Sequence, residues 1–368
     1  MFKAAFRNQT VWLSGHTGFK GAWLAQWLLH LGAKVHGFAL SPPTSPALFD
    51  QLGLASHLQH QLADVRDATA VRESILAAQP DFVFHLAAQP LVRLSYTQPV
   101  ETYATNVMGT VHVMEALRHL EKPCAAVLVT TDKCYENREW LHGYREEDPL
   151  GGHDPYSSSK AAAEIAIASF RRSFFKNHPV KIASARAGNV IGGGDWALDR
   201  IVPDCIRALQ GGQPIPVRNK TATRPWQHVL EPLSGYLWLG ACLAGRSAAR
   251  HSPPAALESA FNFGPAHESN RTVAELAAEV IKHWPGRWED KSDPKAAHEA
   301  GLLHLSTDKA HALLGWAPVW SFPTTVERTV AWYREITAEP QSARAATLRQ
   351  IGEYQAQAAR AALPWAGE

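Results

Sequence analysis

Two hydrophobic patterns alternate along the first half of the chain. Short apolar runs that suit buried strands are each followed by a segment in which apolar residues recur every three or four positions, as on one face of a helix. The predicted strands cover residues 11–14, 34–40, 81–89, 127–129 and 180–184. The predicted helices cover residues 22–31, 68–79, 101–120 and the segment from 156 onward. This alternation predicts an α/β fold, a doubly wound parallel sheet of Rossmann type with a smaller substrate-binding domain.

Beyond residue 190 the regular alternation gives way to a long, turn-rich insert. Helical patterns return near 273–284, 325–336 and 342–362. We therefore predict a dinucleotide-binding domain over 1–186, rejoined at about 224–260. Residues 187–223 and 261–368 are predicted to form mainly the substrate-binding domain.

Composition is typical of a soluble globular protein, because 46% of residues are hydrophobic and 19% are charged. The net charge of +2 gives no reason to expect nucleic acid or a membrane surface as a partner. No segment reads as a signal peptide or a membrane span. The four cysteines are widely spaced, so we expect reduced thiols, no metal site and a cytoplasmic location.

A glycine-rich turn joins the first predicted strand to the first predicted helix. Glycines in such a turn let the backbone approach a pyrophosphate, and the amides of the helix start attract the anion. Plain turn chemistry is the alternative, but the flanking strand and helix favour a dinucleotide site. The acidic residue that usually marks NAD binding is absent between Gly21 and Asp50, and no arginine lies there either, so this test leaves NAD and NADP open. The predicted contacts in this turn are Gly15, His16, Thr17, Gly18, Phe19 and Gly21.

Further cofactor contacts are expected where other strands end. Asp64 and Val65 follow a short possible strand and are candidates for the adenine end. Small residues at the carboxyl end of strand 81–89 leave room for a ligand, although close packing of helix on sheet explains them equally well. These candidates are Leu86, Ala87, Ala88 and Gln89, together with Asn106 on the following helix.

Acid–base chemistry is indicated by two short motifs. The strand at 127–129 runs into Thr131, Asp132 and Lys133, and Tyr156 is followed four residues later by Lys160. On a helix, residues four apart share a face, so the phenol and the ammonium should meet. A nearby cation lowers the pKa of a phenol from ~10, which predicts that Tyr156 acts as a base.

These motifs, with 192–196 and 224–229, resemble the extended short-chain dehydrogenase/reductase family and, within it, the CDP-glucose 4,6-dehydratases. The resemblance runs over roughly residues 10–335 and implies NAD as cofactor and CDP-glucose as the nucleotide-sugar substrate. It implies that a hydride passes from C4 of the glucose to NAD while Tyr156, supported by Lys160 and Thr131, removes the C4 hydroxyl proton. Water then leaves across C5 and C6, with Asp132 as the acid, and the hydride returns to C6.

Lys133 stands where related dTDP-glucose dehydratases have a glutamate that is suited to remove the C5 proton. A lysine base would need a pKa several units below ~10.4, through burial or a nearby cation such as Lys160. Alternatively, a charged Lys133 stabilises the enolate and the base lies elsewhere. Asp132 needs a raised pKa to serve as the acid.

The substrate side is expected to involve Asn189, Asp195, Arg200 and Arg224, with the Arg224 guanidinium on the pyrophosphate. The resemblance also implies a homodimer that pairs through the helices after Ser95 and after Tyr156. Three alternatives stay open: a dehydratase for another nucleotide sugar, an epimerase, and a non-catalytic dinucleotide-sensing protein. The acid at Asp132 speaks against an epimerase, and the Tyr156/Lys160 pair speaks against a sensor.

Overall fold

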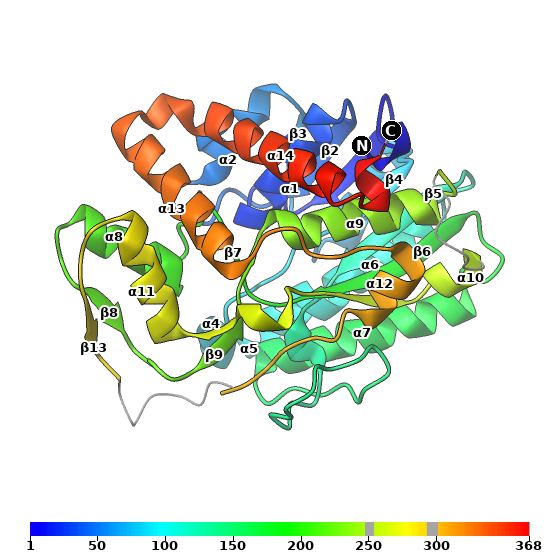
Figure 1. Cartoon of the computed structure of the whole chain (residues 1–368). Coiled ribbons are helices and arrows are strands. Elements are labelled where there is room, and N and C mark those ends of the chain that lie inside the picture. Colours follow the sequence, from blue (N-terminus) through cyan, green and yellow to red (C-terminus); the bar gives the residue numbers. More distant parts are fainter. Residues whose placement is uncertain (247–253, 293–300, 368) are drawn as a thin grey trace.

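The computed structural model describes residues 1–246, 254–292 and 301–367, and within them seven strands form one parallel sheet (Figure 1). The sheet order is β11-β6-β5-β4-β1-β2-β3. From one edge to the other, the strands are β11 (Ala260–Phe263), β6 (Val180–Ala187), β5 (Cys124–Val129), β4 (Phe82–His85), β1 (Thr10–Ser14), β2 (Lys34–Ala39) and β3 (Gln59–Leu62).

The chain changes direction across the sheet between β1 and β4. From β1 it proceeds outward through β2 to β3, and it then returns to build β4, β5 and β6 on the other side. Ligands of open α/β sheets bind at such a switch point, beyond the carboxyl ends of the strands. The topology therefore places the candidate cofactor site above the ends of β1 and β4.

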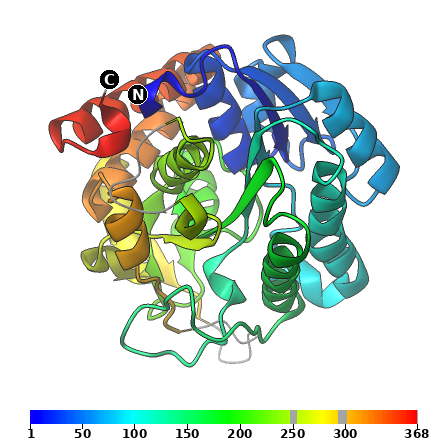
Figure 2. The same cartoon turned by 90° about the vertical axis from the view of Figure 1, so that its right-hand side faces the viewer.

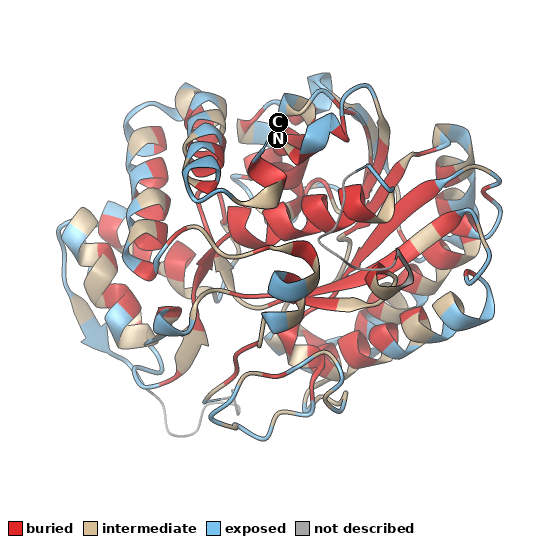
Figure 3. Cartoon of the chain, turned by 45° about the vertical axis from the view of Figure 1, so that its right-hand side comes forward, coloured by how far each residue is buried: buried red, intermediate tan, exposed pale blue. Residues whose placement is uncertain are grey.

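Helices cover both faces of the sheet, as the side view in Figure 2 shows. Alternate residues of each strand serve the two layers: Val11 and Leu13 pack on one side of β1, and Trp12 packs on the other. Buried residues run through the central strands of the sheet (Figure 3), such as β4 and β5. The first layer contains α1 (Phe19–His30), α9 (Leu230–Leu243) and α14 (Ala343–Arg360), and the second contains α3 (Ala68–Ala78), α6 (Gly109–Leu117) and α7 (Pro155–Ser173).

A smaller group of elements lies beside the sheet, on the left of Figure 1. Three two-stranded pairs hold the insert after β6 in place: β10 with β7, β12 with β9 and β13 with β8. These elements are β7 (Val190–Ile191), α8 (Ile201–Gln210), β8 (Ile215–Val217), β9 (Thr223–Pro225), β10 (Gln227–His228), β12 (Asn270–Thr272), α11 (Val273–His283), β13 (Trp288–Asp290) and α13 (Phe322–Ala338). Short helices complete the chain: α2 (Leu48–Gln51), α4 (Val92–Thr97), α5 (Pro99–Tyr103), α10 (Pro254–Leu257) and α12 (Asp308–Leu314).

The predicted elements are found with small shifts. The helix expected at 101–120 is α5, a π-helical turn at Ala104–Met108 and then α6. The strand expected at 81–89 ends at His85, so the small residues after it lie in a loop. No helix of the described residues is long and apolar enough to cross a membrane.

The division into domains stays a prediction, and residues 247–253, 293–300 and 368 of its ranges lie outside the described residues. Two parts of the range 261–368 lie with the large sheet. β11 pairs with β6, and α14 contacts α1.

Candidate active site

The glycine turn between β1 and α1 is packed too tightly for side chains. Gly15 has φ +76°, and a Cβ there would lie 2.7 Å from the backbone nitrogen of Ala87. A Cβ on Gly21 would lie 2.0 Å from the Gly15 carbonyl oxygen. Gly18 is the N-cap of α1, so the turn leads directly into the first amides of a 12-residue helix. This geometry suits a bound pyrophosphate.

His16 and Thr17 hold this turn against the neighbouring strands. The buried His16 ring packs edge-on against Phe49, and its Nε2 lies 2.7 Å from Nδ1 of His60. Burial and the nearby His60 lower the pKa of His16 to about 4, so the ring is neutral near pH 7. Thr17 Oγ1 donates to the carbonyl of Leu40 at 2.9 Å. The side chain of His16 therefore supports the turn, and only its backbone faces the cofactor position.

A buried hydrogen-bond chain fixes the loop after β4. Ser14 Oγ accepts the backbone N–H groups of Leu86 and Ala87, each at 3.1 Å, and therefore donates to Nδ1 of His85 at 2.7 Å. This leaves the His85 proton on Nε2, which donates to Thr110 at 3.1 Å. Burial and the charge of Lys160 lower the pKa of His85 to about 3, so the ring stays neutral.

Asn106 clamps the same loop to the catalytic helix. Its Oδ1 accepts the Gln89 N–H at 2.9 Å, and its Nδ2 donates to the Gln89 carbonyl at 3.1 Å and to Ser159 at 2.9 Å. The Asn106 side chain is fully buried. Ser159 lies between Tyr156 and Lys160, so the predicted cofactor loop and the predicted catalytic pair are held in one rigid arrangement.

At the predicted adenine end, Asp64 already has a partner. Arg66 donates to one Asp64 oxygen through Nε at 2.8 Å and Nη2 at 2.6 Å, and its backbone N–H reaches the other oxygen. Val65 packs against Gly109, where a Cβ would lie 2.8 Å from Val65 Cγ2. Their contact with the adenine end stays a prediction.

Tyr156 and Lys160 lie on the buried face of α7, four residues apart as predicted. Lys160 Nζ donates to the Val129 carbonyl at 3.3 Å, and Tyr156 forms a hydrogen bond with Thr131. Burial raises the pKa of Tyr156 to about 12 in the protein alone, although the hydrogen bond with Thr131 acts in the opposite direction. The expected lowering of the Tyr156 pKa by Lys160 is therefore not found, because burial disfavours the phenolate and raises the pKa.

Asp132, the predicted acid, is buried. One carboxyl oxygen accepts from Thr131 Oγ1 at 3.0 Å, and the other has no hydrogen-bond partner. Burial raises the pKa of Asp132, although Lys133, Thr131 and Arg224 oppose the rise. The side chain is 2% exposed. These properties favour a protonated carboxyl, as the predicted acid requires.

Lys133 is half-buried at the 3₁₀ turn after β5, and its charge lowers the pKa of the neighbouring Asp132. Burial of the depth expected for a lysine base is therefore not found. The position suits an ammonium that faces the reacting sugar.

The predicted substrate residues include two arginines that are electrostatically coupled to the predicted catalytic side chains. Asp195 pairs with Arg200 at 2.9 Å, and this charge raises the pKa of Arg200. Arg200 is electrostatically coupled to Tyr156, and Arg224 to Asp132, so both guanidinium groups lie near the predicted catalytic side chains. Asn189 is half-buried in the turn between β6 and β7.

Lys20 and Tyr236 also belong to this group, although sequence reasoning did not assign them to the site. Burial lowers the pKa of Lys20 to about 7, assisted by the charges of Arg200 and Lys160. Lys20 Nζ lies 3.5 Å from the hydroxyl of the buried Tyr236. The available signal was a lysine in the first turn of the helix that follows the glycines.

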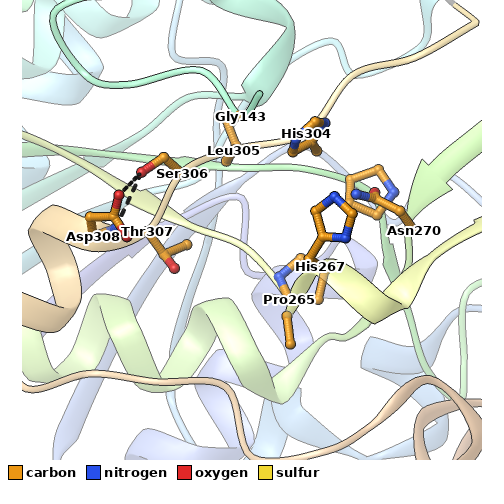
Figure 4. A pocket seen from close by; sticks show the side chains of 11 residues that line it. Gly143, Pro265, His267, Asn270, His304, Leu305, Ser306, Thr307 and Asp308 are labelled. Atoms are coloured by element: carbon orange, nitrogen blue, oxygen red, sulfur yellow. Dashed lines mark hydrogen bonds between the residues drawn. The ribbon is translucent and has the colours of Figure 1, made fainter. Parts of the chain in front are cut away.

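A pocket of about 230 Å³ lies beside β9 (Figure 4). His267 and Asn270 line one side, and Ser306 and Asp308 line the other. Pro225 belongs to its wall and also lies within 3.3 Å of a Cβ built on Gly188, which borders Asp132. The pocket is thus next to the acid, beyond Gly188 and Pro225. The described residues contain no cluster suited to hold a metal ion.

The family model of the GDP-mannose 4,6 dehydratases matches residues 13–329. The chain belongs to this family, within the extended short-chain dehydrogenases/reductases. It is 46% identical over 341 residues to a CDP-glucose 4,6-dehydratase of Salmonella typhimurium, which covers 90% of this chain and 92% of the relative. It is 30% identical over 278 residues to a dTDP-glucose 4,6-dehydratase of Streptomyces antibioticus, with coverages of 74% and 75%.

Solved structures share the fold. A dTDP-glucose 4,6-dehydratase of Streptomyces venezuelae superposes with a TM-score of 0.74 at 22% identity, over 90% of this chain and 99% of that one. An epimerase of Methanothermobacter thermautotrophicus has a TM-score of 0.75 at 22% identity, over 93% and 96%. Dehydratases and epimerases are thus similar to this chain to the same degree in fold, so the reaction must be argued from the site and from sequence identity.

Proposed function

We propose that the chain dehydrates CDP-glucose to CDP-4-dehydro-6-deoxyglucose with NAD as its bound cofactor. The observation that carries this proposal is the buried Asp132 carboxyl, with its raised pKa and one unpartnered oxygen, beside Tyr156. An epimerase returns the hydride to C4 and has no use for an acid that protonates a leaving hydroxyl. The 46% identity to a CDP-glucose 4,6-dehydratase supports the choice of sugar nucleotide.

The residues present fit NAD. The glycine turn admits a pyrophosphate because Gly15 and Gly21 leave no space for side chains, and the start of α1 supplies amides. The loop 86–89 is fixed by Ser14 and Asn106 at the edge where a nicotinamide would meet Lys160. When bound, NAD supplies the acceptor for the C4 hydride and the donor for its return to C6.

Oxidation at C4 requires a base for the hydroxyl proton. Tyr156 receives that proton, Lys160 stabilises the phenolate and Thr131 orients the phenol through their hydrogen bond. Near pH 7 a phenol with a pKa of about 12 is a poor base. The positive charges that surround it, those of Lys160, Arg200 and the oxidised cofactor, favour the phenolate in the working complex.

Elimination moves one proton from C5 to a base other than Lys133, and a second proton to the C6 oxygen. Asp132 provides the second, and the C6 hydroxyl departs as water. Lys133 is half-buried and adjacent, so we assign it a charged role, in which it stabilises the enolate that forms when C5 loses its proton. Arg200 and Arg224 bind the pyrophosphate side of the substrate, and Asp195 and Asn189 help to form that side of the cleft.

Pairing of two copies is also part of the proposal. The adjacent helices α4, α5 and α7 carry exposed apolar side chains, which suits a helix-to-helix interface. These residues are Tyr96, Val100, Tyr103 and Ile165, and Met108 on the π-helical turn after α5 is also exposed. A cytoplasmic location is supported by four buried cysteines that are all free thiols.

The deciding experiment incubates the purified protein with CDP-glucose and, separately, with dTDP-, UDP- and GDP-sugars, and follows the product by mass spectrometry. We expect loss of one water from CDP-glucose alone. Loss of water from another sugar would preserve the mechanism and change the substrate. Isomerisation without a change of mass would establish an epimerase, and cofactor binding without turnover would establish a sensor.

Lys133→Ala separates the two chemical steps. We expect C4 oxidation to persist and water elimination to fall by roughly 10²- to 10³-fold, the usual cost of losing an electrostatic contact made in the transition state. NADH absorbance reports the first step and mass spectrometry the second. Unchanged product formation in Lys133→Ala would exclude this role.

A further inference from the structure

Glu164 lies one helical turn beyond Lys160 on α7 and is 3% exposed. One carboxylate oxygen accepts from Thr130, the residue after β5, and the other accepts from Ser184 and Arg186 of β6 at 2.8 Å each. Burial acts to raise the pKa of Glu164, but the Arg186 charge and these hydrogen bonds outweigh it and leave the pKa lowered. Glu164 is therefore a buried anion.

Arg186 anchors this anion to the rest of the molecule. Its Nη1 donates to the Tyr135 hydroxyl at 2.7 Å and to the Glu146 carbonyl at 3.0 Å. Arg186 is 4% exposed. The carboxylate is thus held in place by β5, β6 and the loop that follows the catalytic 3₁₀ turn.

Lys160 faces ionisable groups from several elements. His85 on β4 and Cys134 on the turn after β5 are neutral near pH 7, because burial lowers the pKa of the imidazole and raises that of the thiol. Lys20 on α1 has a pKa lowered to about 7, so it is largely neutral near pH 8, where Lys160 titrates. Tyr156 is a neutral phenol in the protein alone. Glu164 is the neighbour that carries a negative charge.

Two opposing effects, burial and the charge of Glu164, mainly set the pKa of Lys160. Burial lowers the pKa of Lys160 to about 8, and the charge of Glu164 is the largest effect in the opposite direction. An ammonium that titrates near pH 8 is only just charged under physiological conditions, so loss of one neighbouring anion would neutralise it.

We propose that Glu164 is a positioning residue that keeps Lys160 charged and so sets the upper pH limit of the reaction. The inference rests on the proposed function, in which the Lys160 ammonium stabilises the Tyr156 phenolate. Glu164 touches neither substrate nor cofactor in this account. Arg186 from β6 and Arg171 on α7 are the cations that face it, and they hold it ionised.

The test is Glu164→Gln, which keeps the shape of the side chain and removes its charge. Two measurements are made: the pH dependence of dehydration, and the apparent pKa of Lys160 in the cofactor-free protein by competitive acetylation and peptide mass spectrometry. We expect the alkaline limb of kcat and the Lys160 pKa both to fall by about one pH unit or more, the usual effect of an adjacent charge.

Two further variants separate charge from structure. Ser184→Ala removes one hydrogen bond but keeps the carboxylate. The alkaline limb of kcat and the Lys160 pKa of this variant should therefore match those of the wild type. Glu164→Gln/Arg186→Met removes both partners of the pair, so that no buried charge is left alone if the single variant fails to fold. We expect the double variant to show the same fall as Glu164→Gln.

If the folded double variant has the same alkaline limb of kcat and the same Lys160 pKa as the wild type, the inference is overturned and Glu164 is a purely structural residue. If the wild-type protein dehydrates no nucleotide sugar, the proposed function fails. The acetylation measurement would still decide the role of Glu164 in that case, so the two failures are distinguishable.

Discussion

Two buried carboxyl groups near the Tyr156/Lys160 pair have pKa values that are shifted in opposite directions. Glu164 is 3% exposed and Asp132 is 2% exposed, so desolvation acts on both. Glu164 is bonded by Arg186 and two hydroxyl groups, and its pKa is lowered. Asp132 has a single side-chain donor, Thr131, and its pKa is raised. The Arg186 charge and the hydrogen bonds outweigh burial at Glu164, whereas burial outweighs the opposing groups at Asp132.

The two states suit two roles. A carboxylate with all its bonds made has little to offer a substrate, but it can fix the charge of a neighbour. An acid must keep an oxygen free for the group that it protonates, and the unpartnered Asp132 oxygen meets that need. The cost of an unsatisfied buried polar atom, about 1–3 kcal/mol, is expected at a functional site.

Asp132→Asn tests the acid. The amide has nearly the same shape but cannot protonate the C6 hydroxyl, so dehydration should fall by about 10²- to 10⁴-fold while C4 oxidation remains. Product mass and NADH absorbance separate the two. Asp50→Asn, at an exposed position of α2, is the matched control and should behave as the wild type. Equal loss of both steps would argue that Asp132 is structural.

Arg186→Met tests the anion. It leaves the Glu164 carboxylate buried without its cation, and we expect the free energy of unfolding to fall by about 3–5 kcal/mol, as measured by urea titration. Glu164→Gln/Arg186→Met should recover most of this loss, because the remaining groups are neutral. If the double variant is as unstable as the single one, the cost comes from packing of the arginine stem and not from the buried charge.

Much of the fold follows from local patterns. The expected strand 34–40 is β2 (Lys34–Ala39), and the expected helix 68–79 is α3 (Ala68–Ala78), because hydrophobic periodicity acts within one element. Tyr156 and Lys160 share one helix, so their spacing alone predicts that they meet.

What the sequence leaves open depends on partners that are distant along the chain. Glu164 is also four residues from Lys160, but its cation comes from β6, 22 positions away. Tyr156 illustrates the same limit, since the argument from Lys160 counted a charge and omitted the burial that raises the phenol pKa. Lys20 likewise interacts electrostatically with Asp132 only because α1 packs on the sheet.

A third buried carboxyl tests the comparison in a region without catalysis. Glu231 on α9 accepts the N–H groups of Val319 and Trp320 and the hydroxyl of Tyr354, and burial raises its pKa from 4.5 to about 7. The folded protein therefore holds a proton between pH 4.5 and about 7 that the unfolded chain releases. Its stabilising effect is complete below pH 4.5 and is lost as the pH rises through about 7.

Over this range we expect wild-type stability to fall by about 3 kcal/mol relative to Glu231→Gln, which has no such titration. Urea titrations of both proteins at several pH values measure the difference. If the stabilities of the wild type and of Glu231→Gln change with pH in parallel, Glu231 is ionised in the folded protein, like Glu164.

Gly188→Ala makes a smaller change at the free oxygen of Asp132. A Cβ at Gly188 would lie 2.7 Å from that oxygen, closer than van der Waals contact allows, so the carboxyl must turn away from its present direction. We expect dehydration to slow by roughly 10- to 100-fold, with little effect on C4 oxidation, because a small misplacement of an acid is costly. Gly352→Ala on α14, where a Cβ would meet nothing within 4 Å, is the control. A full dehydration rate in Gly188→Ala would mean that the direction of this oxygen is not used, and the contrast with the fully bonded Glu164 would then rest on pKa alone.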